Sequence, residues 1–250
     1  MHVVSARGAG RPVLLLHGSP SAPGMFEPLV RALEPEHRVI VGALPGYAGS
    51  APLAPYTLEA LHTGIETALA RESDAPWTLV GFSAGSYHVL SLGLRARVKL
   101  GRLVTLGGLP GFGPELAAEY RGLPEAIRAG ALPPETFPPR MLSAPYLAAH
   151  PEARELVGSW LAETTLDVLA DELRAIIEGP DLLPRLSALA MPLLARVGEL
   201  DAVTPVAWSE AIAAAAPRAL LEVVPGSGHA LLVEDAPATC ASIRRFLAGC

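Results

Sequence analysis

The segment Gly81-Phe82-Ser83-Ala84-Gly85 places a serine between glycines, after the apolar residues 77–80 and before a stretch with helical spacing. A serine at such a strand-to-helix turn can serve as a nucleophile, because the glycines relieve crowding and the hydroxyl stands above the sheet. The alternative role for Ser83 is a simple helix N-cap. The strand before it and the helix after it favour the nucleophile.

A serine nucleophile needs a general base near neutral pH, and histidine has a suitable pKa. Of the seven histidines, His229 alone lies in a glycine-rich loop, Gly226-Ser227-Gly228-His229, directly after an expected strand. The alternative for His229 is a loop histidine that binds only the backbone. We expect His62 and His88, which lie within helical patterns, to be structural or exposed, and His17 to form local hydrogen bonds.

The base in turn needs an acid that orients the imidazole and stabilises its protonated form. Asp201 follows the apolar residues 193–197 and is our predicted acid; helix capping is its alternative role. Thr204 can cap the next helix and Pro205 can occupy its first position. Glu199 is the chief rival, and we expect it to face solvent or to pair locally.

These residues require a scaffold, and the sequence predicts a doubly wound, mostly parallel α/β sheet. Helix-length amphipathic segments separate most of the short runs rich in valine and leucine, and this alternation is typical of parallel sheets. The expected strands include residues 13–16, 39–41, 78–80, 103–106, 193–197 and 220–224. The expected core helices are residues 26–33, 58–71, 84–94, 206–215 and 236–247.

The alternation is interrupted between the fourth and fifth of these strands. Proline-rich stretches there, such as residues 132–134 and 137–139, predict short helices joined by stiff turns. We therefore divide the chain into a core domain, residues 1–107 and 191–250, and an inserted helical cap, residues 108–190.

The composition limits the classes of partner. The formal net charge is −6 and the pI is near 5.7, which gives no general attraction for nucleic acid or anionic membranes. With 18% charged residues and a mean hydropathy of +0.36, the chain is expected to be globular. The longest apolar runs are too short for a signal peptide or membrane span, so we expect a cytoplasmic protein.

Four motifs resemble those of the α/β-hydrolase superfamily, in that family's order of serine, aspartate and histidine. They are His17-Gly18-Ser19-Pro20, Gly81-Phe82-Ser83-Ala84-Gly85, Gly198-Glu199-Leu200-Asp201 with Pro205, and Gly226-Ser227-Gly228-His229. The resemblance implies the α/β-hydrolase fold. About a dozen residues precede Val13, so we expect a shortened N-terminal edge of the sheet.

An acyl-transfer site must also donate hydrogen bonds to the oxyanion of the reaction intermediate. The backbone N–H of Ala84, next to the nucleophile at a helix start, is one predicted donor. Pro20 has no N–H, so the second predicted donor is the N–H of Ser19.

The cap offers apolar side chains for an acyl pocket: Phe112, Leu116, Tyr120, Phe137, Met141, Tyr146, Trp160 and Leu161. Packing within the cap is the alternative role of each. Our predicted substrate-binding residues are Met25, Phe26, Phe82, Phe112, Met141, Tyr146 and Trp160. The cap stretch 140–147 with residues 181–183 is loosely similar to enol-lactonase-type members of the superfamily.

The sequence thus predicts a serine hydrolase that cleaves a small or medium carboxylic ester or lactone through an acyl-enzyme. An acyltransferase or C–C bond hydrolase would use the same three side chains, and a slow ligand-binding or signalling protein could retain them. No metal-ligand cluster and no dinucleotide motif is present, so we expect neither metal nor cofactor. The expected partner is a small acyl substrate, with the chain acting as a monomer or homodimer.

Overall fold

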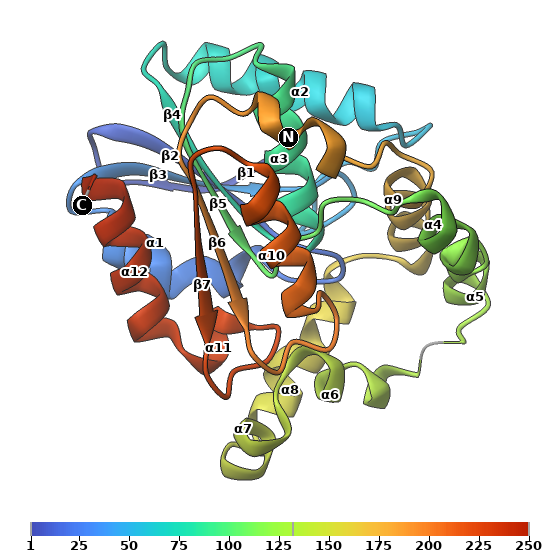
Figure 1. Ribbon diagram of the computed structural model, residues 1–250. Helices are drawn as coiled ribbons and strands as arrows, with labels where there is room; N and C mark the ends of the chain where they lie inside the picture. The colour runs from blue at the N-terminus through green and yellow to red at the C-terminus, as the bar shows by residue number, and fades with distance from the viewer. Residues whose placement is uncertain (1, 132, 250) are drawn as a thin grey trace.

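The computed structural model describes residues 2–131 and 133–249, which contain one seven-stranded sheet (Figure 1). Its strand order is β1-β3-β2-β4-β5-β6-β7, and only β1 runs antiparallel to its neighbour, β3. The strands are β1 (His2–Arg7), β2 (Arg11–Leu16), β3 (His37–Ala43), β4 (Trp77–Phe82), β5 (Leu100–Leu106), β6 (Leu193–Gly198) and β7 (Ala219–Val224). The predicted fold class is confirmed, with one antiparallel strand at the short N-terminal edge of the described sheet.

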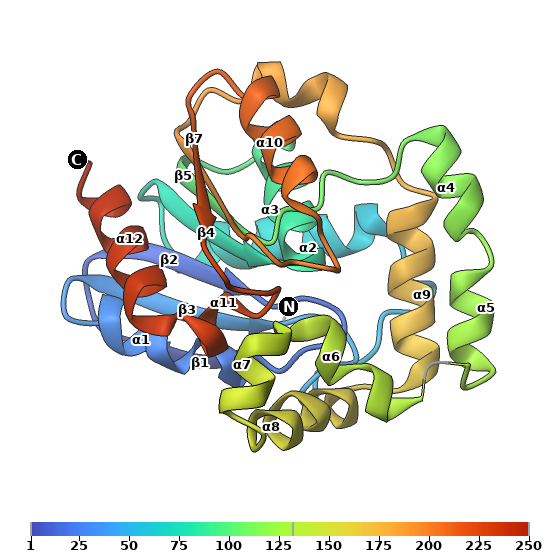
Figure 2. The same cartoon turned by 60° about the horizontal axis from the view of Figure 1, so that its bottom comes forward.

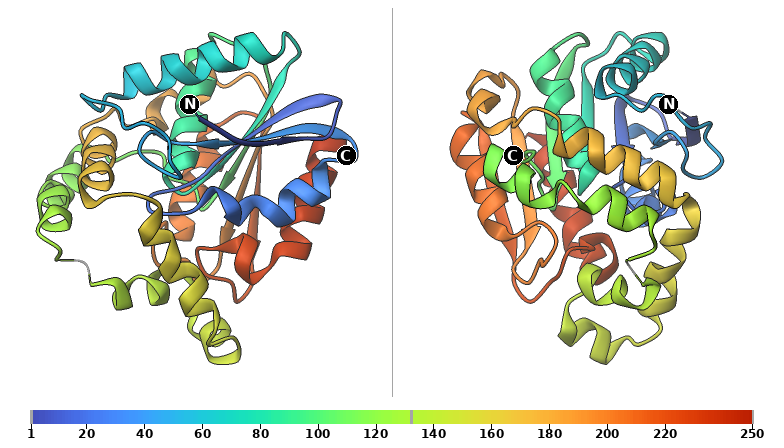
Figure 3. Two further views of the ribbon diagram at one scale, coloured as in Figure 1. Left: turned by 180° about the vertical axis from the view of Figure 1, so that it is seen from behind. Right: turned by 90° about the vertical axis from the view of Figure 1, so that its right-hand side faces the viewer.

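Helices cover both faces of the sheet, because side chains alternate between its faces. Val13 and Leu15 of β2 belong to one buried cluster, and Leu14 and Leu16 belong to the other. Figure 3 shows α1 and α12 side by side in its left panel, and these two helices cover the first face. The core helices are α1 (Glu27–Leu33), α11 (Leu231–Glu234) and α12 (Ala236–Ala248) on the first face, and α2 (Leu58–Glu72), α3 (Ala84–Arg95) and α10 (Val206–Ala215) on the second.

The sequence of α2 shows how such a helix is specified. Thr57 caps it, since its hydroxyl oxygen accepts a hydrogen bond from Ala60 N at 3.3 Å. Leu61, Ile65 and Leu69 then recur every four residues and are all buried against the sheet. No helix among residues 2–131 and 133–249 is long and apolar enough to cross a membrane.

Between β5 and β6 the chain forms a layer of short helices, which we interpret as the cap. Figure 2 shows α4, α5 and α9 together at the right and α6, α7 and α8 at the lower centre. Prolines stand in the first turns of α4, α5, α6 and α7 and limit how far each preceding segment can stay helical. The helices are α4 (Pro114–Tyr120), α5 (Leu123–Arg128), α6 (Pro138–Met141), α7 (Ala144–Ala149), α8 (Ala153–Ser159) and α9 (Leu166–Ile177).

The cap layer is joined to the core in two ways. The 3₁₀ turn Leu183–Ala188, at the end of the insertion, contacts α3 and α10 and therefore packs as part of the core. Helix α9 instead contributes Glu172, a fully buried carboxylate that accepts a hydrogen bond from the hydroxyl of Tyr47 at 2.8 Å. The cap thus has both an apolar and a polar attachment to the sheet domain.

Glu172 is one end of a buried polar chain through the core. His88 Nε2 on α3 lies 3.5 Å from Glu172 Oε1, and its Nδ1 lies 3.1 Å from His62 Nε2 on α2. Burial alone would raise the pKa of Glu172, but its hydrogen bonds with His88 and Tyr47 and the charge of His88 hold that pKa below its usual value. The predicted structural role of His62 and His88 agrees with these contacts.

This chain predicts how stability depends on pH. Burial, with the nearby His88 and Arg95, lowers the pKa of His62 from 6.5 to about 2. Below pH 6.5 His62 therefore binds a proton in the unfolded state but not in the folded state. The free energy of unfolding falls as the pH drops below 6.5. We expect His62 to lower the free energy of unfolding by up to about 1.4 kcal/mol for each pH unit below 6.5.

Urea unfolding of the wild type and of His62→Gln at pH 7 and pH 5 measures this contribution. The free energy of unfolding should fall less between these pH values in His62→Gln than in the wild type. His150→Gln is the matched control, because the His150 side chain is half exposed and lies outside the buried chain of Glu172, His88 and His62. Equal pH dependence in all three proteins would contradict the assignment.

Candidate active site

Ser83 occupies a sharp turn between β4 and α3. Its backbone has φ 53° and ψ −120°, a conformation that L residues rarely adopt and that costs on the order of 1–3 kcal/mol. The turn requires glycine on both sides: a Cβ at Gly81 would lie 2.2 Å from Gly85 O, and one at Gly85 would lie 2.3 Å from Leu16 O. The structure therefore shows the strand-turn-helix context that the sequence predicted.

The loop after β2 approaches this turn closely. A Cβ at Gly18 would lie 2.7 Å from the Cβ of Ser83, so only glycine allows the loop to come so near. His17 fixes the loop, since its Nδ1 lies 2.8 Å from Gly18 O and its Nε2 accepts a hydrogen bond from Leu44 N at 3.0 Å. Burial lowers the pKa of His17, which fits a neutral, structural imidazole.

Asp201 and His229 form a buried pair at the same edge of the sheet. His229 Nδ1 lies 2.8 Å from Asp201 Oδ2, and both side chains are excluded from solvent. Because Nδ1–H donates to the carboxylate, Nε2 is left as the basic nitrogen. Nε2 is itself buried and makes no hydrogen bond with any described residue.

The loop after β6 holds Asp201 ionised. Its Oδ1 accepts hydrogen bonds from Val203 N at 2.9 Å and Thr204 N at 2.8 Å, and its Oδ2 accepts one from Thr204 Oγ1 at 2.9 Å. Burial alone would raise the pKa of Asp201, but His229 and these backbone N–H groups hold it below its usual value. A carboxylate in this state can support a protonated imidazole.

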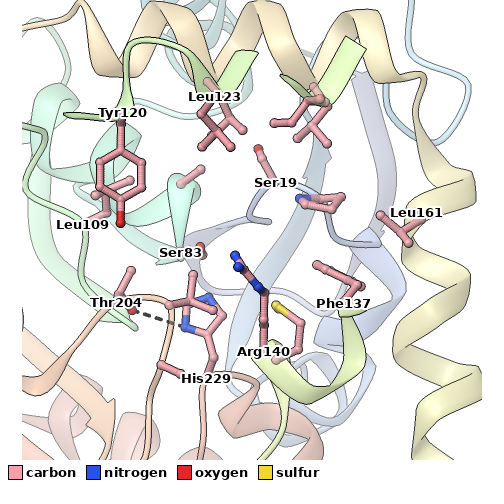
Figure 4. A pocket seen from close by; sticks show the side chains of 18 of the residues that line it. Ser19, Ser83, Leu109, Tyr120, Leu123, Phe137, Arg140, Leu161, Thr204 and His229 are labelled. Atoms are coloured by element: carbon pink, nitrogen blue, oxygen red, sulfur yellow. Dashed lines mark hydrogen bonds between the residues drawn. The ribbon is translucent and has the colours of Figure 1, made fainter. Parts of the chain in front are cut away.

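Thr204 differs from its predicted role. The helix α10 begins at Val206, and Pro205 is its cap residue, so Thr204 does not cap it. Its hydroxyl instead donates to Asp201 and lies 3.2 Å from His229 Nδ1, as the dashed line in Figure 4 marks. Because the threonine hydroxyl is within reach of both partners, it binds the pair rather than the helix.

Glu199 and Asp201 point to different places although they are two residues apart. Glu199 is exposed, and its Oε2 accepts a hydrogen bond from Gly226 N at 2.8 Å. It makes no hydrogen bond with His229 in the part of the chain that the structure describes. The local pairing predicted for Glu199 agrees with this contact.

The two predicted oxyanion donors border the same cavity as Ser83. Ser19 and Ala84 both line it, and neither backbone N–H donates to another described group. Ala84 is the first residue of α3, so its N–H has no partner inside the helix. Two free N–H groups near the serine could bind an oxyanion.

The cavity above Ser83 has a volume of about 220 Å³ and a mainly apolar lining. Three of the seven predicted substrate-binding residues line it, namely Phe82, Phe112 and Met141. Tyr120, Phe137 and Leu161 of the cap also do so, whereas Leu116 is not among the lining residues. Figure 4 shows Tyr120, Phe137 and Leu161 surrounding the space that Ser83 and His229 face.

The other four predicted substrate-binding residues lie elsewhere, and this corrects the sequence interpretation. Met25 and Phe26 form the turn before α1 and pack into the core cluster on the first face of the sheet. Trp160 is buried in that same cluster. Tyr146 packs against it, with its hydroxyl donating to Val233 O at 3.0 Å. None of these four side chains lines the cavity, because each packs against other apolar side chains of the protein.

The sequence interpretation missed the apolar wall that α9 contributes to the cavity. Leu166, Leu169, Leu173 and Ile177 line it from one face of that helix. Their spacing of three, four and four residues is the signal that could have identified them. Leu123, Ile127, Arg140 and Trp208 also line the cavity and were not predicted.

Gly107 is a further supporting residue that the sequence interpretation missed. It follows β5 with φ 62°, and a Cβ there would lie 2.8 Å from both His229 Cε1 and Thr204 Oγ1. The imidazole also packs on Phe82, with 4.7 Å between ring centroids. The ring of His229 is therefore held between Gly107, Phe82 and the carboxylate.

The described residues contain no group of three or more histidine, cysteine or acidic side chains that could hold a metal ion.

The sequence profile of the alpha/beta hydrolase family matches residues 13–243. The chain belongs to that family. The predicted membership of the α/β-hydrolase superfamily, and with it the prediction of a hydrolytic enzyme, is confirmed.

Several relatives are similar over nearly their whole length. The pimeloyl-[acyl-carrier protein] methyl ester esterase of Xanthomonas campestris pv. campestris is 29% identical over 270 residues, covering 99% of each chain. The enzyme of that name from Vibrio vulnificus is 25% identical, covering 96% of this chain and 95% of its own. A thermophilic esterase from Thermogutta terrifontis, solved with malate bound, has a TM-score of 0.87 and 28% identity, covering 98% and 92%.

The enol-lactonase from Burkholderia xenovorans LB400 shares the fold. Its structure has a TM-score of 0.86 with 22% identity, and the match covers 99% of this chain and 96% of that one.

The two acidic residues of the β6 loop give a direct prediction. Asp201→Asn keeps the side-chain shape but removes the charge that orients His229 and supports its cation, so kcat should fall by something approaching 10⁴-fold. Glu199→Gln removes a negative charge but keeps an oxygen that can accept the hydrogen bond from Gly226 N, so it should cost less than about tenfold. Parallel kcat measurements on one ester decide the matter: a larger loss in Glu199→Gln would make Glu199 the acid.

Proposed function

We propose that this chain is a carboxylic ester hydrolase that works through an acyl-enzyme on Ser83, with His229 as general base and Asp201 as its supporting acid. The observation that carries the proposal is the buried Asp201–His229 pair. It leaves Nε2 without a hydrogen-bond partner at the cavity where Ser83 is presented on a strained turn.

The proposed reaction has two stages. Ser83 Oγ attacks the ester carbonyl carbon while His229 Nε2 takes the hydroxyl proton, and the N–H groups of Ser19 and Ala84 bind the carbonyl oxygen as it becomes negative. The tetrahedral intermediate collapses, and the protonated imidazole gives its proton to the departing alcohol. Water, deprotonated by His229, then attacks the acyl-enzyme. The protonated imidazole returns its proton to Ser83 Oγ as the bond to the acyl group breaks, which releases the carboxylic acid and restores the enzyme.

No hydrogen bond joins Ser83 Oγ to His229 Nε2 among the described residues. Catalytic hydrogen bonds are often long before substrate binds and tighten in the complex. The cavity supports a small or medium acyl group, because most of its lining is aliphatic or aromatic.

The full-length relatives support an open-chain ester as the first substrate class to examine. The Xanthomonas and Vibrio proteins are named as methyl ester esterases, and the Thermogutta protein as an esterase. We carry over only ester hydrolysis, with methyl esters as the first class to test and lactones as the second.

Ser83→Ala tests the nucleophile. It should remove essentially all hydrolysis of p-nitrophenyl butyrate, since the attacking oxygen is gone, while thermal unfolding stays close to that of the wild type. Ser159→Ala, an exposed serine on the cap, is the matched control and should retain wild-type kcat.

A covalent label distinguishes loss of the nucleophile from indirect damage. A fluorophosphonate should add one adduct to the wild type and to Ser159→Ala, and none to Ser83→Ala, by intact-mass spectrometry. Retention of more than about a hundredth of wild-type kcat in Ser83→Ala, or labelling of that variant, would show that another residue is the nucleophile.

A further inference from the structure

The cavity contains one feature that ester cleavage does not use, the guanidinium of Arg140. Among the described residues that line the cavity, Arg140 is the only arginine, lysine, aspartate or glutamate. It belongs to α6, directly before Met141, whose side chain also borders the cavity. Figure 4 shows its side chain extending into the same space that Ser83 and His229 face.

Arg140 makes no ion pair or hydrogen bond through its side chain with any residue in the described part of the chain. Arg128 and Arg174 of the cap are paired, the first with Asp171 and the second with Glu125. Those pairs lie between α5 and α9, where they hold the two helices together. Arg121, Arg154 and Arg185 have no such pair among the described residues either, but none of them lines the cavity. The guanidinium at the cavity is therefore a free cation with five N–H donors available for a ligand.

The surroundings of Arg140 determine which ligand suits it. Arg140 is exposed, so water hydrates its guanidinium before a ligand enters. A ligand in the cavity would displace part of that water, and the apolar part of the lining, including Leu166, Leu169 and Phe137, offers no substitute partner. A neutral apolar ligand would therefore leave part of the cation without a hydrogen-bond partner, which is unfavourable. A carboxylate would instead accept two parallel hydrogen bonds from the planar guanidinium.

We propose that Arg140 is a specificity-determining residue that binds a carboxylate carried by the substrate, so that the preferred substrates are esters with a second, free acid group. The inference rests on the proposed ester hydrolysis at Ser83 and deepens it. The acid group can belong to the acyl part, as in a monoester of a dicarboxylic acid, or to the alcohol part. Arg140 takes no proton and forms no covalent bond in the reaction.

The test compares matched pairs of esters that differ only in charge. Monomethyl glutarate carries a carboxylate where methyl 5-methylhexanoate carries an isopropyl group of similar shape, and monomethyl succinate and adipate vary the spacing. An ester of butyric acid with 3-hydroxypropanoate examines the alcohol side against its isopropyl counterpart. For each pair the measured quantity is the ratio of kcat/KM for the charged ester to kcat/KM for the neutral one.

We expect the wild type to favour the charged member of at least one pair by about tenfold or more, as for a charge-assisted hydrogen-bonded pair. In Arg140→Gln that ratio should fall by about tenfold, in Arg140→Glu it should fall further, and Arg140→Lys should lie between wild type and Arg140→Gln. Arg244→Gln changes the net charge equally but lies on α12, where Arg244 pairs with Glu36, and should keep the wild-type ratio.

A ratio near one in the wild type for every pair, or a preference that Arg140→Gln retains in full, would overturn the proposal. Failure of the proposed function is seen separately, as absence of hydrolysis of the neutral esters and of p-nitrophenyl butyrate by the wild type. Binding of monomethyl glutarate to Ser83→Ala and to the double variant Ser83→Ala/Arg140→Gln, measured by calorimetry, needs no turnover. The dissociation constant should rise by about tenfold in the double variant, and equal constants would also overturn the proposal.

Discussion

The strained backbone at Ser83 is the constraint on which the rest of the site depends. A residue with φ 53° and ψ −120° persists only if its surroundings over-determine it. Here Ser83 N donates to Leu106 O at 2.9 Å, and Ser86 Oγ accepts a hydrogen bond from Leu109 N at 2.7 Å, so the turn is tied to the end of β5. Gly18 allows the neighbouring loop to close over it. The carboxyl ends of β2, β4 and β5 are thereby fixed around one hydroxyl.

The second requirement is to bury a charge without losing stability. Asp201 accepts four hydrogen bonds, two from backbone N–H groups, one from Thr204 Oγ1 and one from His229. A carboxylate bound in this way remains ionised in a solvent-free position, because each lost water contact has a protein replacement. The Asp201 side chain therefore does two things at once: it holds the turn that leads to α10, and it supports the imidazole of His229. In the sequence these two roles looked like alternatives.

The sequence predicted those parts of the protein that local patterns determine. Buried parallel strands are continuous apolar runs, and the glycines around Ser83 mark a turn that few other residues allow. Strand β1 was not identified, because all of its side chains are exposed or half exposed and its pattern is weak. The cavity lining was predicted poorly, since Trp160 and Leu173 are both apolar cap residues and only their packing decides which one faces the cavity. Arg140 had no local signal at all.

The hydrogen bond between Tyr47 and Glu172 limits how freely the inserted region can be exchanged during evolution or engineering. Insertions between two strands are usually regarded as modules that can be replaced while the scaffold stays constant. In this protein a graft that removed α9 would leave Tyr47 and His88 without their buried acceptor, and a foreign scaffold receiving α9 would enclose an unpaired carboxylate. The inserted region and the turn after β3 must therefore be transferred as one unit.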